Sequence, residues 1–172
     1  MFPKSSALST VRTVTRFRAS PEQVWATMMF YEEIPGRPNP LLRLILPLPV
    51  STQGEKTRVG ALIHCTYEGG SLEKKITAVD PARALRFEVC KQALGIEDCI
   101  ETTDGSYELR ADGDDTELAL TTRYHGRLRP RWLFEPVEKL VGHGLHRHIL
   151  RGMRVALETA AKADVKPAFA KV

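Results

Sequence analysis

The feature that most constrains the fold is a run of segments with period-two patterning between residues 57 and 126, followed by one long helical segment. Apolar and β-branched residues alternate with polar ones over 57–68, 71–79, 84–92, 95–103, 106–111 and 117–126. This alternation is typical of half-buried strands. The separators are short and carry turn residues, at GG 69–70, DPAR 80–83, DG 104–105 and DGDD 112–115. Such short links predict an antiparallel meander, although Gly105 also fits a bulge inside one long strand.

Two elements are expected before the meander. Residues 8–18 are rich in β-branched residues and predict a strand. The following SPEQVWATMMFYEE predicts a short helix, because Ser20 is a good N-cap, Pro21 suits the first helical position and Gln23 completes a capping box.

The stretch from 35 to 55 is interrupted by prolines, which end regular structure. Within it, LLRLILPLP (41–49) fits either a second short helix or a packed loop. The sequence STQGEK (51–56) is typical of a loop.

The last element is one long helix over RPRWLFEPVEKLVGHGLHRHILRGMRVALETAAKA (129–163). Gly142, Gly144 and Gly152 are unusual there, since each costs about 1 kcal/mol relative to alanine in a helix. They indicate a close backbone approach or a bend. A twisted seven-stranded sheet needs one face covered, and only this helix is long enough to cover it. The space between the two predicts a ligand cavity of a few hundred Å³.

Composition narrows the function. With 172 residues and 42% hydrophobic content, we expect a single domain over 1–172. The net charge of +4 is interspersed, so no nucleic-acid partner is expected. The most apolar run, 41–50, is too short to span a membrane, which needs about 20 residues. The three cysteines contain no CxxC and the N-terminus lacks a signal-peptide core, so we expect free thiols and a cytoplasmic location.

Several motifs resemble one known superfamily over residues 8 to 160. They are ASPEQVWATM (19–28), VGALIHCTYEGG (59–70), ITAVDPARALRFEV (76–89), GSYELRADGDDTELALTTRY (105–124) and LRPRWLFEPVE (128–138). Together they resemble the helix-grip proteins of the START and birch-pollen-allergen (SRPBCC) superfamily, in particular its polyketide cyclase/dehydrase and lipid-transport branch.

This resemblance implies an α+β helix-grip fold. A seven-stranded curved antiparallel sheet would wrap around a long C-terminal helix, with two short helices after the first strand. It also implies a hydrophobic small-molecule ligand and no cofactor. It carries over no catalytic residue, because the chemistry differs between branches of the superfamily.

The long helix contains three histidines in HGLHRHILRGMR (143–154). At about 100° per residue, His148 falls in one stripe with Phe134, Val141, Leu145, Gly152 and Val155. His143 and His146 fall on the opposite side with Arg147 and Arg154, which predicts a solvated face. The histidines therefore cannot converge on one ion, and no metal site is expected. A buried His148 is either a core residue or a proton shuttle that faces the cavity.

Strand alternation supplies the other candidates. Tyr107 and Leu109 should point inward, as should Leu118, Leu120, Thr122 and Tyr124. The parity of His64 stays open, because Ile63, Cys65 and Tyr67 form an equally good inner face. If the chain is an enzyme, we expect His148 to act with Tyr107 or Tyr124. The expected ligand-binding residues are His64, Tyr67, Phe87, Leu109, Leu120, Thr122, Trp132, Val141, Leu145 and Gly152.

Three functions remain open. The first is binding of a lipid or polyketide-like molecule in the cavity, and the second is a polyketide cyclase or dehydratase. The third is an interaction module that uses the apolar 41–50 segment. Arg127, Arg129 and Arg131 form either a basic rim that aids solubility or a site for an acidic group at the cavity mouth. The sequence does not indicate an oligomeric state.

Overall fold

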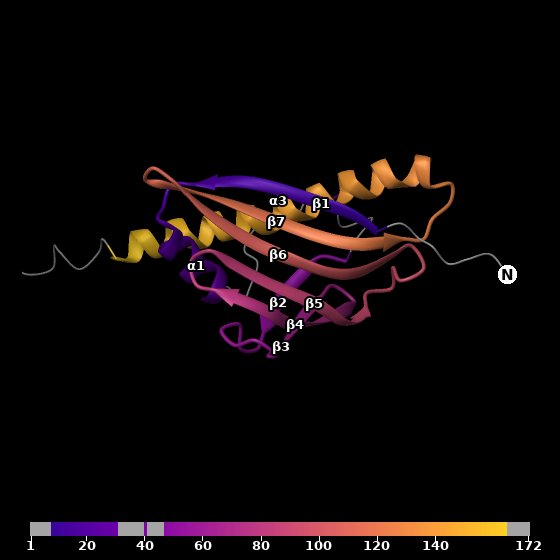
Figure 1. Cartoon of the computed structure of the whole chain (residues 1–172), viewed down its shortest axis with the longest axis horizontal. Coiled ribbons are helices and arrows are strands. Elements are labelled where there is room, and N and C mark those ends of the chain that lie inside the picture. The colour runs from indigo at the N-terminus through magenta and orange to yellow at the C-terminus, as the bar shows by residue number, and fades with distance from the viewer. Residues whose placement is uncertain (1–7, 31–39, 41–46, 165–172) are drawn as a thin grey trace, which may run out of the picture.

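Seven antiparallel strands form one curled sheet in this computed structural model, which describes residues 8–30, 40 and 47–164. The strands are β1 (Leu8–Phe17), β2 (Pro49–Gln53), β3 (Leu62–Tyr67), β4 (Gly70–Asp80), β5 (Ala84–Ala93), β6 (Ile100–Asp112) and β7 (Asp115–Gly126). Their order is β1-β7-β6-β5-β4-β3-β2, so β2 to β7 form a meander and β1 pairs with the last strand (Figure 1).

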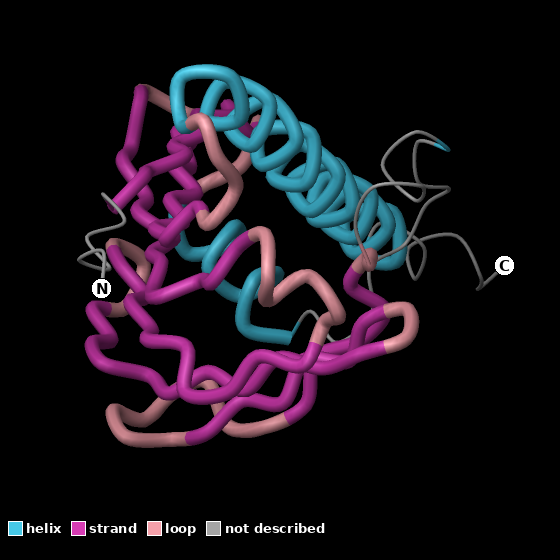
Figure 2. The backbone as a smooth tube through the Cα atoms, turned by 90° about the vertical axis from the view of Figure 1, so that its right-hand side faces the viewer, coloured by secondary structure: helices cyan, strands magenta, loops and turns pink. Residues whose placement is uncertain are grey.

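Among the described residues, two helices accompany the sheet. The short α1 (Pro21–Phe30) follows β1, and the long α3 (Arg131–Asp164) ends the described chain. Figure 2 shows α3 lying across the open side of the curled sheet, with the shorter helix inside the curl. The predicted α+β helix-grip architecture is therefore confirmed. The second short helix expected over 41–49 falls almost entirely outside the described residues.

The capping box that predicted α1 is present. The backbone N–H of Ser20 donates to the Gln23 side-chain oxygen at 3.0 Å, and the Gln23 N–H donates to the Ser20 hydroxyl at 3.4 Å. These bonds satisfy donors that the first turn of a helix leaves unpaired.

Two details of the meander differ from the prediction. Of the segments 95–103 and 106–111, residues 95–99 lie before β6 and the rest belong to this one strand, which continues through a bulge between Thr102 and Asp104, close to the Gly105 bulge that the sequence left open. After the extra residue of a bulge, the side chains that had pointed inward at even positions do so at odd positions. The alternation in the sequence is therefore interrupted, as it would be between two separate strands. Strand β2, in contrast, was missed. Pro49 pairs with Tyr67 at the edge of the sheet, where a residue without an N–H is tolerated.

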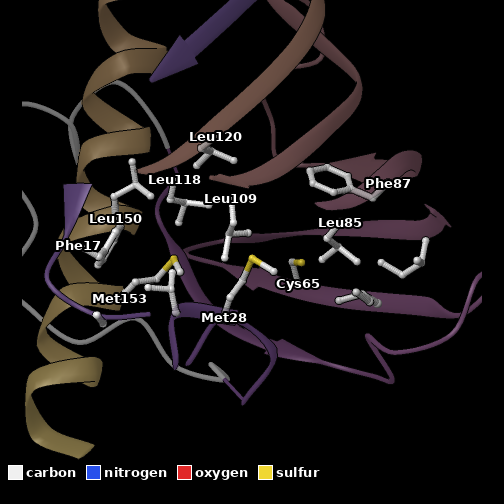
Figure 3. Close-up of a cluster of buried hydrophobic side chains, with 14 of the residues drawn as sticks. Phe17, Met28, Cys65, Leu85, Phe87, Leu109, Leu118, Leu120, Leu150 and Met153 are labelled. Atoms are coloured by element: carbon white, nitrogen blue, oxygen red, sulfur yellow. The ribbon is translucent and has the colours of Figure 1, made fainter. Parts of the chain in front are cut away.

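The core lies between the concave face of the sheet, α1 and the middle of α3. Phe17, Ile76, Leu118, Leu150 and Met153 are almost completely buried in it. Figure 3 shows Leu118, Leu150 and Met153 close together, with Met28 of α1 beside them. This packing fixes α3 against the sheet at its centre.

The N-terminal half of α3 is held differently. A Cβ added to Gly142 would lie 2.9 Å from Val11 Cγ2, so the helix backbone approaches β1 closely, as one of the two glycine expectations stated. One turn earlier, Glu138 receives two hydrogen bonds from Arg131, at 2.7 and 2.8 Å. The helix is thus anchored to the sheet by a close contact and, at its start, braced by a largely buried ion pair. Among the described residues, no helix has a stretch long and apolar enough to cross a bilayer.

Candidate functional site

A cavity of about 120 Å³ lies between the concave face of the sheet and the N-terminal half of α3. Its wall is mainly apolar, with a few polar side chains that point into it. The apolar lining residues include Val11, Leu72, Phe87, Leu94, Ile96, Ile100, Leu120, Val141, Leu145 and Ile149. The polar ones include Tyr67, Lys74, Thr102, Tyr107, Thr122, Tyr124, Glu138 and His146.

A second cavity of about 70 Å³ continues toward α1 and β2. Tyr67, Lys74, Phe87, Tyr107 and Ile149 line both spaces, so these five side chains form the partition between them. The expected volume of a few hundred Å³ is therefore wrong for the structure as it stands, because large side chains divide and fill the space.

Lys74 is the only lysine that lines the first cavity within the described chain, and its ammonium lies 4.4 Å from the centre of the Phe87 ring. This distance is within the range of a cation–π interaction. Burial lowers the pKa of Lys74, but Cys65, Tyr67 and Tyr107 outweigh that effect and raise it above its ordinary value. No carboxylate contributes to this balance. The Cys65 side chain also forms a hydrogen bond with Lys74, so the groups that act on this amine among the described residues are a thiol and two phenols.

Tyr124 is 4% exposed, and among the described residues its hydroxyl forms no hydrogen bond of good geometry, with Ser9 as its nearest weak partner, which lowers its pKa slightly. Burial first, and then the nearby Glu138, raises the pKa of Tyr124 to about 12. Burial also raises the pKa values of Tyr67, to about 12, and of Tyr107. All three phenols are thus protonated at neutral pH and can donate a hydrogen bond to a ligand.

His146 lies at the centre of a hydrogen-bonded chain on the other side of the cavity. Its Nε2 is 2.9 Å from the hydroxyl of Thr122, and its Nδ1 is 3.0 Å from the hydroxyl of Thr13. The same Thr13 oxygen is 2.8 Å from Nδ1 of His143. His146 is 2% exposed, and burial lowers its pKa to about 4, with smaller contributions from His143 and Lys74. The imidazole of His146 is therefore neutral at physiological pH.

Eight of the residues expected at the site do line the first cavity. They are Tyr67, Phe87, Tyr107, Leu120, Thr122, Tyr124, Val141 and Leu145. Their inward direction follows from the alternation of their strands and, for the last two, from the helical periodicity of α3.

The other expected residues lie elsewhere. Leu109 is buried in the core cluster, and Gly152 is buried at the middle of α3, away from the cavity lining. His64 is exposed on the outer face of β3, because Ile63 and Cys65 take the inner one. Trp132 is 77% exposed in the first turn of α3.

The expected position of His148 is also wrong. It lines neither cavity, whereas Tyr107 and Tyr124 both line the first one. The buried face of α3 runs through Glu138, Gly142, His146, Leu150 and Met153. The predicted stripe also included Val155, which is 48% exposed, so its phase was displaced from the face that is buried.

Lys74 was not predicted to lie at the site, and His146 was predicted to face the solvent. Lys74 lies between Leu72 and Ile76, both buried, so period-two alternation alone would have placed it inward. For His146, the useful signal was the glycine four residues earlier, since a glycine on a helix marks the face that approaches its neighbour.

The arginine rim is largely occupied. Arg127 pairs with Glu101 at the end of the sheet, and Arg131 pairs with Glu138. Arg129 is exposed. Over residues 8–30 and 47–164, no group of three or more histidine, cysteine or carboxylate side chains is arranged to hold a metal ion.

Comparison with known proteins gives structural matches only. No family model matches the chain, and no curated protein sequence matches it. A START superfamily protein from Mycobacterium smegmatis matches with a TM-score of 0.63 at 10% identity, over 88% of this chain and 98% of that one. Norcoclaurine synthase from Thalictrum flavum, in complex with dopamine and hydroxybenzaldehyde, matches with a TM-score of 0.59 at 15% identity, over 92% and 89%. The Aha1 dimer from Colwellia psychrerythraea matches with a TM-score of 0.55 at 17% identity, over 87% and 96%.

These matches and the element order show the fold: the chain has a helix-grip fold like that of START proteins. The proteins that share it differ in what they do, so the fold by itself does not identify an activity.

Proposed function

We propose that this chain binds a small hydrophobic molecule that carries an aromatic ring and an acidic or strongly polar oxygen, as simple polyketide-like and lipid-derived molecules do. The apolar wall of the cavity favours a ring or short chain. The ammonium of Lys74 favours an oxygen with negative charge, since it has no carboxylate partner.

The observation that carries this proposal is the buried hydroxyl of Tyr124 in the cavity wall, which forms no hydrogen bond of good geometry among the described residues and has only Ser9 as a weak partner there. Leaving a buried polar group without a partner costs about 1–3 kcal/mol. A ligand oxygen that accepts a hydrogen bond from this hydroxyl would remove that free-energy cost, which the free protein retains.

The size of the cavity sets the size of the ligand. A dry cavity of about 150 Å³ is large enough for one benzene ring, and the volume here is about 120 Å³. A single ring therefore fits with small side-chain adjustments, and a longer molecule requires the Tyr67–Phe87–Tyr107 partition to move. The fold relative from Thalictrum flavum, solved with dopamine and hydroxybenzaldehyde, carries single-ring molecules of this kind.

The first experiment is native mass spectrometry of the protein purified from its own host, followed by extraction of any retained molecule. A retained aromatic acid or phenol supports the proposal. A retained long-chain neutral lipid contradicts it.

The second experiment compares two probes, benzoate and toluene, by NMR titration. The wild-type protein should bind benzoate at least ten times more tightly, and Lys74→Met should abolish this preference. Lys75→Met is the matched control, because Lys75 is the next residue, is exposed and pairs with Glu88 at 3.2 Å. If neither probe shifts resonances of cavity residues, the binding proposal itself is wrong.

A second candidate function is acid–base catalysis of the polyketide cyclase or dehydratase type. It is favoured by a neutral histidine and three phenols in the wall of one apolar cavity, with the lysine opposite. The test is exchange of the methyl protons of acetophenone in D2O, in the presence of wild-type protein and of His146→Gln. Exchange above the buffer rate that disappears in the variant supports catalysis, and exchange at the buffer rate contradicts it.

A further inference from the structure

Thr13 lies between two histidines, and its hydroxyl is within hydrogen-bond distance of Nδ1 of both. The distances are 2.8 Å to His143 and 3.0 Å to His146. A threonine hydroxyl has one proton to donate and lone pairs to accept. Because it carries a single proton, it can donate to only one of the two imidazoles, and the other imidazole bonds to it only as a donor.

This constraint couples the two rings. If Thr13 donates to His143, then Nδ1 of His146 must carry a proton. A neutral imidazole has only one N–H, so Nε2 of His146 then accepts from Thr122, at 2.9 Å. If Thr13 donates to His146 instead, Nδ1 of His143 carries a proton, and Nε2–H of His146 donates to Thr122.

The two arrangements differ at the cavity. Thr122 lines the cavity, and His143 is half-buried at the opposite end of the chain of bonds. In the first arrangement the Thr122 proton points to His146, so its oxygen can only accept from a ligand. In the second arrangement the Thr122 hydroxyl is free to donate into the cavity.

We propose that His143, Thr13, His146 and Thr122 form a proton relay between the protein surface and the cavity, which removes a proton from a ligand hydroxyl or enol and later returns one. Its use on a ligand rests on the function proposed above, but the relay itself is a property of the free protein.

The transfer balances at each oxygen and nitrogen. The ligand gives a proton to Thr122 Oγ1 as the Thr122 proton passes to Nε2 of His146. The Nδ1 proton of His146 passes to Thr13, and the Thr13 proton passes to Nδ1 of His143. His143 then releases its Nε2 proton to water. The reverse sequence returns a proton to the ligand, so removal and return alternate, as an isomerisation, cyclisation or dehydration requires.

The surroundings favour this route over a stable positive charge on His146. The groups that act on its charge are His143 on the same helix and Lys74 from β4, and both oppose protonation. Burial acts in the same direction. His146 is therefore neutral in both end states and passes protons from one nitrogen to the other.

The test is an NMR titration of protein labelled with 15N-histidine, with no ligand added. When His143 becomes an imidazolium, both of its nitrogens carry protons, so Thr13 accepts from His143 and its own proton is available to Nδ1 of His146. We expect His146 to change completely to the Nε2–H tautomer with the same midpoint pH as the titration of His143. A tautomer of His146 that stays constant while His143 titrates overturns the proposal.

Three variants separate the relay from a structural role. In Thr13→Val the tautomer of His146 should no longer follow His143, and continued coupling overturns the proposal. Thr15→Val, on the same face two residues along β1, should leave the coupling intact. If Thr13→Val fails to fold, His143→Gln gives the same information, because glutamine can bond to Thr13 but does not titrate. The ligand experiments are separate from this titration. The protein can therefore fail to bind benzoate while the two histidines are coupled, or bind benzoate while they are not.

Discussion

Arg131 holds the carboxylate of Glu138 through two parallel hydrogen bonds, seven residues apart in the sequence and almost completely out of contact with water. Planar pairs of this kind are the strongest that side chains form. This one joins the first turn of α3 to its second, next to the cavity, and Arg131 also approaches Ser9 of β1.

Replacing one partner of this pair should be strongly destabilising. We expect Glu138→Gln to lower the free energy of unfolding by roughly 3–5 kcal/mol, because it leaves the Arg131 charge buried without compensation. Urea denaturation measures the change. Lys139→Gln is the control, since Lys139 forms an exposed pair with Glu135 one turn away and its loss should have no measurable effect. Equal effects of the two variants would contradict the assignment.

Gly142 should not tolerate a side chain. Alanine is normally better than glycine in a helix by about 1 kcal/mol, but here its Cβ meets Val11 at 2.9 Å. Overpacking of this kind costs about 1–3 kcal/mol, so the net effect of Gly142→Ala should be destabilising. In a Val11→Ala background the same substitution should become neutral or stabilising. A double-mutant cycle without such coupling would show that the contact is not the cause.

The low pKa of His146 predicts a loss of stability in acid. The unfolded state binds a proton near pH 6.5, whereas the folded state binds it only near pH 4. The stability is therefore complete above pH 6.5 and falls progressively as the pH drops to 4, by roughly 3 kcal/mol in total. His146→Gln should remove this part of the pH dependence, as measured by urea midpoints at pH 7.5 and pH 4.5. If the stability of the wild-type protein changed with pH as little as that of the variant, the lowered pKa of His146 would be contradicted.

Tyr124→Phe should not destabilise the free protein. The variant removes a hydroxyl that forms no hydrogen bond of good geometry among the described residues and has only Ser9 as a weak partner, so the free energy of unfolding should change by less than about 1 kcal/mol. Thr116→Val provides the contrast, because the Thr116 hydroxyl donates to the Ala19 carbonyl at 2.7 Å and its loss should destabilise. The phenylalanine variant should at the same time bind benzoate more weakly. A clear loss of stability in Tyr124→Phe would indicate a hidden partner.

The fold was more predictable than the site. The strand alternation of the meander and the capping box of α1 each involve residues close together in the chain. Both can therefore be recognised in the sequence. The pairing of Pro49 with Tyr67 depends on the position of an edge strand, which local propensity does not encode.

Predicting which residues line the cavity required knowledge of tertiary contacts. Tyr107 and Tyr124 were placed inward correctly, because parity is local. His148 was misplaced and His146 assigned to the solvent, since the phase of α3 is set by Gly142 against Val11 and by the buried ion pair. Both are tertiary contacts that override the apolar pattern of the helix.

The bulge in β6 also determines how this cavity can be redesigned. Before the bulge the even-numbered positions Ile100 and Thr102 face the cavity, and after it the odd-numbered Tyr107 does. A library that randomises every second residue along β6 would thus alter the cavity on one side of Thr103 and the outer surface on the other. Deleting Thr103 would remove the bulge and turn the inward-facing side chains of one half of β6 outward. The one extra residue is therefore what allows both halves of the strand to line the same cavity.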